Sequence, residues 1–130
     1  MHDQPMVSIV DDDKSVRDAM RTLVNSFGLE ANTFTCAEAF LESGRVEETC
    51  CLITDWQMPG MSGVELQEFM VAKGYSTPII FITAFPEERI RSRVLGAGAV
   101  GFLAKPFTEE SLIGCLERAL RSVGLDGYIQ

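Results

Sequence analysis

The sequence predicts an α/β fold in which a five-stranded parallel sheet is covered by helices on both faces. Short, nearly continuous apolar segments alternate with longer segments whose apolar residues recur every three or four positions. Strands that are apolar along their whole length are typical of a parallel sheet buried on both sides. The chain has 130 residues, the length of a typical single domain. We therefore expect one domain over residues 1–130, with a core over about 6–123.

Three strands are predicted in the first half of the chain, over 6–10, 30–34 and 50–54. The second of these is the most polar and is expected at an edge of the sheet. An apolar stripe from Val16 to Phe27 has helical spacing, and Gly28 follows it as a stop signal. A short helix is expected over 37–43.

Two further strands are predicted in the second half, over 78–83 and 99–104. Ser62 can cap a helix over about 63–73. Pro86 suits the first turn of a helix over about 86–96, because its missing N–H is not needed there. Thr108 is expected to cap the last helix.

The composition excludes several classes of function. Lys and Arg number 11 against 19 Asp and Glu, and the net charge of −8 argues against nucleic-acid binding by this chain. No apolar stretch is long enough for a membrane span, and the first residues lack a signal-peptide pattern, so a cytoplasmic protein without a membrane partner is expected. Four cysteines without C-x-x-C spacing are expected to be buried free thiols.

Polar residues follow four of the predicted strands. Asp11 to Asp13 follow the first strand, Asp55 follows the third, Thr83 and Ala84 end the fourth, and Lys105 follows the fifth. Flavodoxin-like sheets have the strand order 2-1-3-4-5, and this order would make those four strands neighbours. Ligands bind such sheets beyond the carboxyl ends of the strands, so we expect a site there.

The residue types at these strand ends suggest phosphoryl chemistry. Carboxylates that converge without an adjacent base need raised pKa values or a cation, and oxygen ligands with room for water suit Mg²⁺. The Thr83 hydroxyl and the Lys105 ammonium can hold phosphoryl oxygens, and the small Ala84 lets backbone N–H groups approach. Transfer of a phosphoryl group to a carboxylate needs in-line positioning and charge neutralisation.

Four motifs occur in order at these positions: "IVDDD", "LITDWQMPGMSG", "FITAF" and "GFLAKPF". On these residues the chain resembles a two-component response-regulator receiver domain, over about residues 6–123. Within that family, "AGAVGFLAKPF" looks most like regulators of the nitrogen-fixation type. The resemblance implies that a sensor histidine kinase or a phosphotransfer protein donates a phosphoryl group to this chain.

The resemblance also implies a role for individual residues. Asp55 would be the phosphoacceptor, and Mg²⁺ would be held by Asp12 directly, by Asp11 largely through water, by Asp55 and by the Gln57 carbonyl. The phosphoryl group would be surrounded by Trp56, Thr83, Ala84 and Lys105, with Thr83 and Lys105 gripping it.

Further implied features concern switching. Phe102 would be an aromatic switch that turns inward when Thr83 moves, and the Lys105-Pro106 bond would be cis. Positions 57 and 85 often tune hydrolysis in this family. The helix over 86–96, with the fifth strand and the last helix, would form the output face.

Simpler interpretations remain for several of these residues. Asp13 can be only a helix cap, Asp11 and Asp12 can be cap and loop acids, and Phe102 can be a half-buried strand aromatic. "DDDKS" also fits the D-x-D-x-[ST] signature of haloacid-dehalogenase-type phosphohydrolases, with Asp11 as nucleophile and Asp13 as acid/base. That interpretation leaves Asp55 unexplained and lacks an acidic pair after Lys105 to bind the metal, because Glu109 and Glu110 are expected in the first turn of the last helix. A third interpretation is a receiver-like scaffold that is not phosphorylated.

The sequence leaves two alternatives for how the chain would pass on a signal. The chain could act alone through protein contacts, or it could regulate transcription through a DNA-binding domain beyond residue 130. Phosphorylation-dependent homodimerisation is a further expectation.

Overall fold

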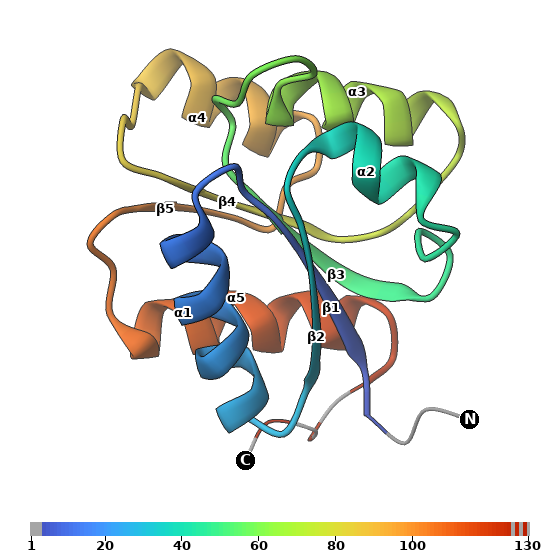
Figure 1. Ribbon diagram of the computed structural model, residues 1–130, viewed down its shortest axis with the longest axis vertical. Helices are drawn as coiled ribbons and strands as arrows, with labels where there is room; N and C mark the ends of the chain where they lie inside the picture. Colours follow the sequence, from blue (N-terminus) through green and yellow to red (C-terminus); the bar gives the residue numbers. More distant parts are fainter. Residues whose placement is uncertain (1–3, 126, 128, 130) are drawn as a thin grey trace.

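The computed structural model describes residues 4–125, 127 and 129, and within them a five-stranded parallel sheet has the order β2-β1-β3-β4-β5 (Figure 1). The strands are β1 (Met6–Val10), β2 (Glu30–Phe34), β3 (Thr49–Thr54), β4 (Ile79–Thr83) and β5 (Gly101–Ala104). The predicted fold class is confirmed, including the strand order and the place of the polar β2 at an edge.

The described residues contain five helices, of which four connect consecutive strands and the last follows β5. They are α1 (Lys14–Ser26), α2 (Ala37–Glu42), α3 (Gly63–Ala72), α4 (Glu88–Gly96) and α5 (Glu109–Ser122). Helices α1 and α5 cover one face of the sheet, while α2, α3 and α4 cover the other (Figure 1). This arrangement gives the sheet two separate buried layers.

The first core cluster lies between the sheet and helices α1 and α5. It consists of Val7, Ile9, Met20, Val24, Phe27, Leu29, Cys51, Ile53, Ile80, Ile82, Leu112, Cys115, Leu116, Ala119 and Leu120. The second core cluster lies under α2, α3 and α4 and consists of Val10, Ala37, Phe40, Val46, Leu52, Met58, Val64, Leu66, Met70, Ile79, Phe81, Ile90 and Val94. Alternate residues of one strand enter different clusters, as the pleat of a strand requires.

Three helices begin at the side-chain caps predicted for them. Asp13 accepts a hydrogen bond from the Ser15 N–H, and Thr108 accepts one from the Ser111 N–H. Ser62 caps α3 in a reciprocal capping box with Glu65. Each cap satisfies N–H groups that the first helical turn leaves without a partner. Because these caps follow the strand-end loops closely, they also hold the loops in place.

Two predicted boundaries are wrong by two residues. Helix α4 begins at Glu88 instead of residue 86, so Pro86 belongs to the preceding loop. Strand β5 begins at Gly101 instead of residue 99, because the Ala99 N–H donates to the Val94 carbonyl and closes the end of α4.

Within the described part of the chain, no helix has the length and apolar character needed to cross a membrane. All four cysteines are free thiols, as predicted. Cys51 and Cys115 are buried in the first core cluster, and this burial raises the pKa of both thiols. Cys36 and Cys50 are only half-buried.

Candidate functional site

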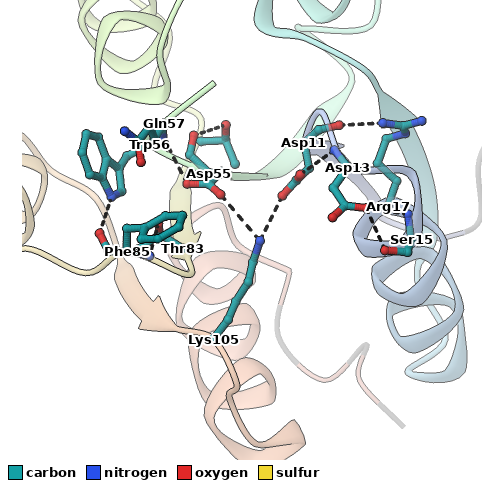
Figure 2. A network of polar contacts seen from close by, with 11 residues as sticks. Asp11, Asp13, Ser15, Arg17, Asp55, Trp56, Gln57, Thr83, Phe85 and Lys105 are labelled. Atoms are coloured by element: carbon teal, nitrogen blue, oxygen red, sulfur yellow. Dashed lines mark hydrogen bonds and ion pairs between the residues drawn. The ribbon is translucent and has the colours of Figure 1, made fainter. Parts of the chain in front are cut away.

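Three charged side chains converge at the carboxyl ends of the strands. The strand registers pair Val10 with Thr54 and Thr83 with Ala104, so the residues that follow these positions emerge at one edge of the sheet. Asp11, Asp55 and Lys105 meet there (Figure 2). The sequence predicted this convergence.

Lys105 lies between the two carboxylates. Its Nζ is 3.3 Å from Asp11 Oδ2 and 3.5 Å from Asp55 Oδ2. The side chains of Asp11, Asp55 and Lys105 are 6%, 12% and 22% exposed, so solvent screens these charges less than it does at an open surface. One ammonium therefore compensates part of the repulsion between two shielded carboxylates.

Asp11 is held by contacts on both its side chain and its backbone. Its Oδ1 accepts the Asp13 N–H at 2.9 Å, and its carbonyl accepts Arg17 Nη1 at 2.9 Å. Burial raises the pKa of the Asp11 carboxyl, although the Asp13 N–H and the Lys105 ammonium oppose the shift. The Arg17 contact was not predicted, because a helix arginine usually points to solvent.

Asp55 is held mainly through its own loop. Its Oδ1 accepts the Gln57 N–H at 3.1 Å, and its carbonyl accepts the Thr54 hydroxyl at 3.0 Å. Gly63 donates its N–H to the Trp56 carbonyl at 2.9 Å. A Cβ at position 63 would overlap the Asp55 carbonyl oxygen, so the loop closes this tightly only because residue 63 is glycine.

The three consecutive aspartates have different environments. Asp13 is the N-cap of α1, and hydrogen bonds from the Ser15 hydroxyl and N–H lower the pKa of its carboxyl. Asp12 is exposed and lines the same cleft as Asp11 and Asp55. Across the described residues, no three acidic, thiol or imidazole groups are close enough to form a ready metal cluster. A ligand role for Asp12 therefore requires its side chain to turn toward the other two.

Thr83 is completely buried at the end of β4. Its Oγ1 accepts the Phe85 N–H at 3.1 Å, and its carbonyl accepts the Lys105 N–H at 2.8 Å. Phe102 is half-buried on β5, with its ring centroid 6.5 Å from that of Phe81 in the second core cluster. The Lys105-Pro106 bond is cis, as the resemblance implied.

Trp56 makes a contact that sequence reasoning missed. Its Nε1 donates to the Phe85 carbonyl at 3.0 Å, and this bond connects the loop after β3 with the loop after β4 (Figure 2). Glu38 was also missed: its Oε2 accepts the Met61 N–H at 3.1 Å and ties α2 to the loop after β3. Neither contact has a sequence signal, because periodicity does not set which neighbouring loop a side chain reaches.

An open cleft of about 850 Å³ lies above these groups. It is lined by Asp11, Asp12, Asp13, Asp55, Gln57, Met58, Pro59, Ala84, Phe85, Glu87 and Lys105. Every predicted metal-ligating residue lines it, as do the predicted phosphate-contact residues Asp55, Ala84 and Lys105. Trp56 and Thr83 lie beside it as supporting residues.

The residues present fit a magnesium ion. Two shielded carboxylates already share one cation, Lys105, and the cleft leaves room for water around them. Mg²⁺ is commonly bound by one or two carboxylates together with water and phosphate oxygens. Hard oxygen donors predominate in the lining, and no thiol or imidazole is among the lining residues.

Known proteins with similar sequences are response regulators. The model of the response regulator receiver domain family matches residues 7–117. The response regulator protein TmoT of Ectopseudomonas mendocina is 40% identical over 122 residues, which cover 93% of this chain and 56% of TmoT. The transcriptional regulatory protein FixJ of Azorhizobium caulinodans is 34% identical over 114 residues, covering 88% of this chain and 54% of FixJ. The chain thus spans about half the length of the curated relatives it matches.

Solved structures agree in fold. The response regulator StyR is 47% identical with a TM-score of 0.84, over 92% of this chain and 60% of that chain. FixJ-N is 34% identical with a TM-score of 0.80, over 93% of this chain and 96% of that chain.

Proposed function

The chain belongs to the response regulator receiver family, and on that premise we propose that it accepts a phosphoryl group on Asp55 from a sensor histidine kinase or a phosphotransfer protein. One observation carries this assignment to Asp55: its carboxylate shares the Lys105 ammonium with Asp11 at the floor of an open cleft. A carboxylate that is paired with an ammonium and opens onto a cleft is placed to receive a group whose oxygens that ammonium can then bind.

In the transfer, an Asp55 carboxylate oxygen attacks the phosphorus of a phosphohistidine. A new O–P bond forms while the P–N bond breaks, and the imidazole leaves with the electron pair and takes up a proton. The Gln57 N–H holds Oδ1, which leaves Oδ2, the oxygen nearer to Lys105, for the attack. Lys105 then exchanges the carboxylate for a phosphoryl oxygen and neutralises part of its charge.

Mg²⁺ would be held by the carboxylates of Asp11, Asp12 and Asp55 and by the Gln57 carbonyl. When bound, it supplies positive charge against the phosphoryl oxygens in the transition state. Asp11 is prepared for this role because its side chain is positioned by the Asp13 N–H and its backbone by Arg17. Asp12 contributes after rotating inward from its exposed position.

Phosphorylation would be read out through Thr83 and Phe102. The Thr83 oxygen accepts from the Phe85 N–H, so its own hydrogen is free to be donated to a phosphoryl oxygen. Movement of Thr83 toward Asp55 opens space beside Phe102, which already borders the second core cluster. The surface formed by α4, β5 and α5 would then change and could support a phosphorylation-dependent homodimer. Relatives such as FixJ are named transcriptional regulators, and we propose the same output for the longer protein.

Labelling with a small phosphodonor tests the acceptor assignment. With Mg²⁺ present, acetyl phosphate should label the chain on Asp55, and Asp55→Asn should abolish the label. Asp12→Ala should lose most of it, whereas Asp13→Ala, which removes only a helix cap, should retain it. A stable adduct on Asp11 would instead support the phosphohydrolase alternative, and equal losses from Asp12→Ala and Asp13→Ala would contradict the separate roles of these two aspartates.

A further inference from the structure

The cleft above Asp55 has two walls that come from different loops. Residues 57–59, which follow β3, form one wall, and Ala84, Phe85 and Glu87, which follow β4, form the other. The hydrogen bond from Trp56 Nε1 to the Phe85 carbonyl, 3.0 Å long, connects them directly (Figure 2). Trp56 follows Asp55 directly in the chain, so this hydrogen bond lies next to the proposed acceptor.

Phe85 has little else to hold it in place. Its side chain is 67% exposed, so apolar packing contributes little to its position. Its N–H is bonded to Thr83 Oγ1 and its carbonyl to Trp56, so both of its backbone polar groups are used in these two contacts. The helix beyond it, α4, begins at Glu88, and its N-cap residue Glu87 makes no side-chain cap hydrogen bond. The Trp56 bond is therefore a principal restraint on this wall.

The width between the walls matters for an acyl phosphate. Hydrolysis requires a water molecule to attack the phosphorus in line with the O–P bond to Asp55, from the side opposite that carboxylate. That side faces the open cleft, between the two walls. A wall that swings outward admits water, and it also stretches the hydrogen bond from the Phe85 N–H to Thr83 Oγ1.

We propose that Trp56 is a positioning residue that sets the lifetime of the acyl phosphate by holding the Phe85 carbonyl through its indole N–H. This inference rests on the proposed phosphorylation of Asp55 and adds to it a residue that acts through the β4–α4 loop. Trp56 does not itself need to touch the phosphoryl group. The hydrogen bond, more than the bulk of the ring, carries the effect.

The chain offers a direct test, because Trp56 is its only tryptophan. Biosynthetic incorporation of 3-benzothienylalanine replaces the indole N–H with sulfur and keeps both rings, and Trp56→Phe gives a second variant without the donor. Each protein is labelled with acetyl phosphate and Mg²⁺, the donor is removed, and the decay of labelled protein is followed. Phe69→Leu changes another partly exposed aromatic residue, on α3, and is the matched control.

We expect the benzothienyl protein and Trp56→Phe both to lose the label about fivefold faster than the unmodified chain, the equivalent of one neutral hydrogen bond. Their thermal midpoints should fall by only a few degrees, as the loss of one hydrogen bond predicts, and hydrogen exchange at the Phe85 amide should be faster. Phe69→Leu should decay at the unmodified rate.

Several outcomes would overturn the inference. A benzothienyl protein that decays like the unmodified chain would assign the effect to packing, and unchanged or slower decay in both variants would remove Trp56 from the control of lifetime. If the unmodified chain takes no label on Asp55, the proposed function fails and this inference fails with it. If Asp55 is labelled but its lifetime ignores Trp56, only this inference fails.

Discussion

Helices α4 and α5 flank the same strand, β5, but they are attached to the domain in different ways. Helix α5 has 14 residues and buries Leu112, Cys115, Leu116, Ala119 and Leu120 in the first core cluster. Helix α4 has nine residues and buries only Ile90 and Val94, in the second core cluster. Apolar burial therefore holds α5 much more strongly than α4.

The helix ends differ in the same direction. Helix α5 has a Thr108 cap, Glu109 and Glu110 in its first turn and Arg121 in its last, all favourable for the helix dipole. Helix α4 likewise has Glu88 in its first turn and Arg93 in its last, but it has no side-chain cap hydrogen bond at Glu87. Its start is therefore the less stable of the two.

Helix α4, which buries few apolar side chains, is also held by polar contacts with α3. Gln67, only 2% exposed, donates its Nε2 to the Val94 carbonyl at 3.0 Å. Arg93 and Glu68 form an ion pair at 2.7 Å. An exposed ion pair of this kind can be exchanged for contacts with water or a partner at small cost, whereas buried apolar surface cannot. Helix α4 is thus the part of the proposed output face suited to move, with α5 as its fixed support.

Truncation of one buried side chain in each helix gives the largest expected contrast. Leu116→Ala should lower the free energy of unfolding by about 4 kcal/mol, because Leu116 is fully enclosed in the first core cluster. Ile90→Ala should cost about 2 kcal/mol, because the short helix can close part of the space. Urea denaturation measures both, and equal losses would break the comparison.

Removal of the buried amide is expected to act on α4 alone. Gln67→Ala should cost about 1–2 kcal/mol and should speed hydrogen exchange in α4, because the Gln67–Val94 bond is lost. Amide exchange in α5 should stay as it is, and this serves as the internal control. Faster exchange in both helices would show that they unfold as one unit.

A new N-cap on α4 should reduce the difference in stability between the starts of α4 and α5. Glu87→Ser supplies an oxygen for the orphan N–H groups of the first turn and should raise stability by about 1 kcal/mol. Thr108→Ala in α5 should lower it by a similar amount. If α4 is the moving element, Glu87→Ser should also weaken any phosphorylation-dependent change in the protein's oligomeric state, which light scattering can follow. An unchanged response would place the motion elsewhere.

The exposed ion pair should have the smallest effect. Arg93 and Glu68 are 55% and 57% exposed, so Arg93→Ala should cost less than about 0.5 kcal/mol. About 1 M salt should remove most of that difference, because it screens exposed charges. A larger, salt-independent loss would mean that the Arg93 stem packs on α3 and holds the helix.

The sequence predicted the parts of the structure that periodicity and caps control. The five strands, the Asp13, Ser62 and Thr108 caps and the meeting of Asp11, Asp55 and Lys105 were all visible in residue patterns. Such features follow from where strands end in a parallel sheet.

The remainder depends on tertiary geometry. The start of α4 was predicted at Pro86, but without a cap the helix begins two residues later. The reach of Trp56 to Phe85, of Arg17 to the Asp11 carbonyl and of Gln67 to Val94 depends on how neighbouring loops and helices lie, which no local pattern specifies.

Gly63 has a consequence for how mutational scans of this chain are interpreted. No side chain fits between residue 63 and the Asp55 carbonyl, so every substitution at Gly63 must displace the loop that carries Asp55, the proposed acceptor. A screen for signalling would then rank Gly63 beside Asp55, although glycine offers no group to a phosphoryl oxygen or a metal. Loss of signalling on substitution of Gly63 reports that the loop has no room for a side chain there. A stability assay run in parallel is needed to distinguish such a packing defect from the loss of a group that takes part in phosphorylation.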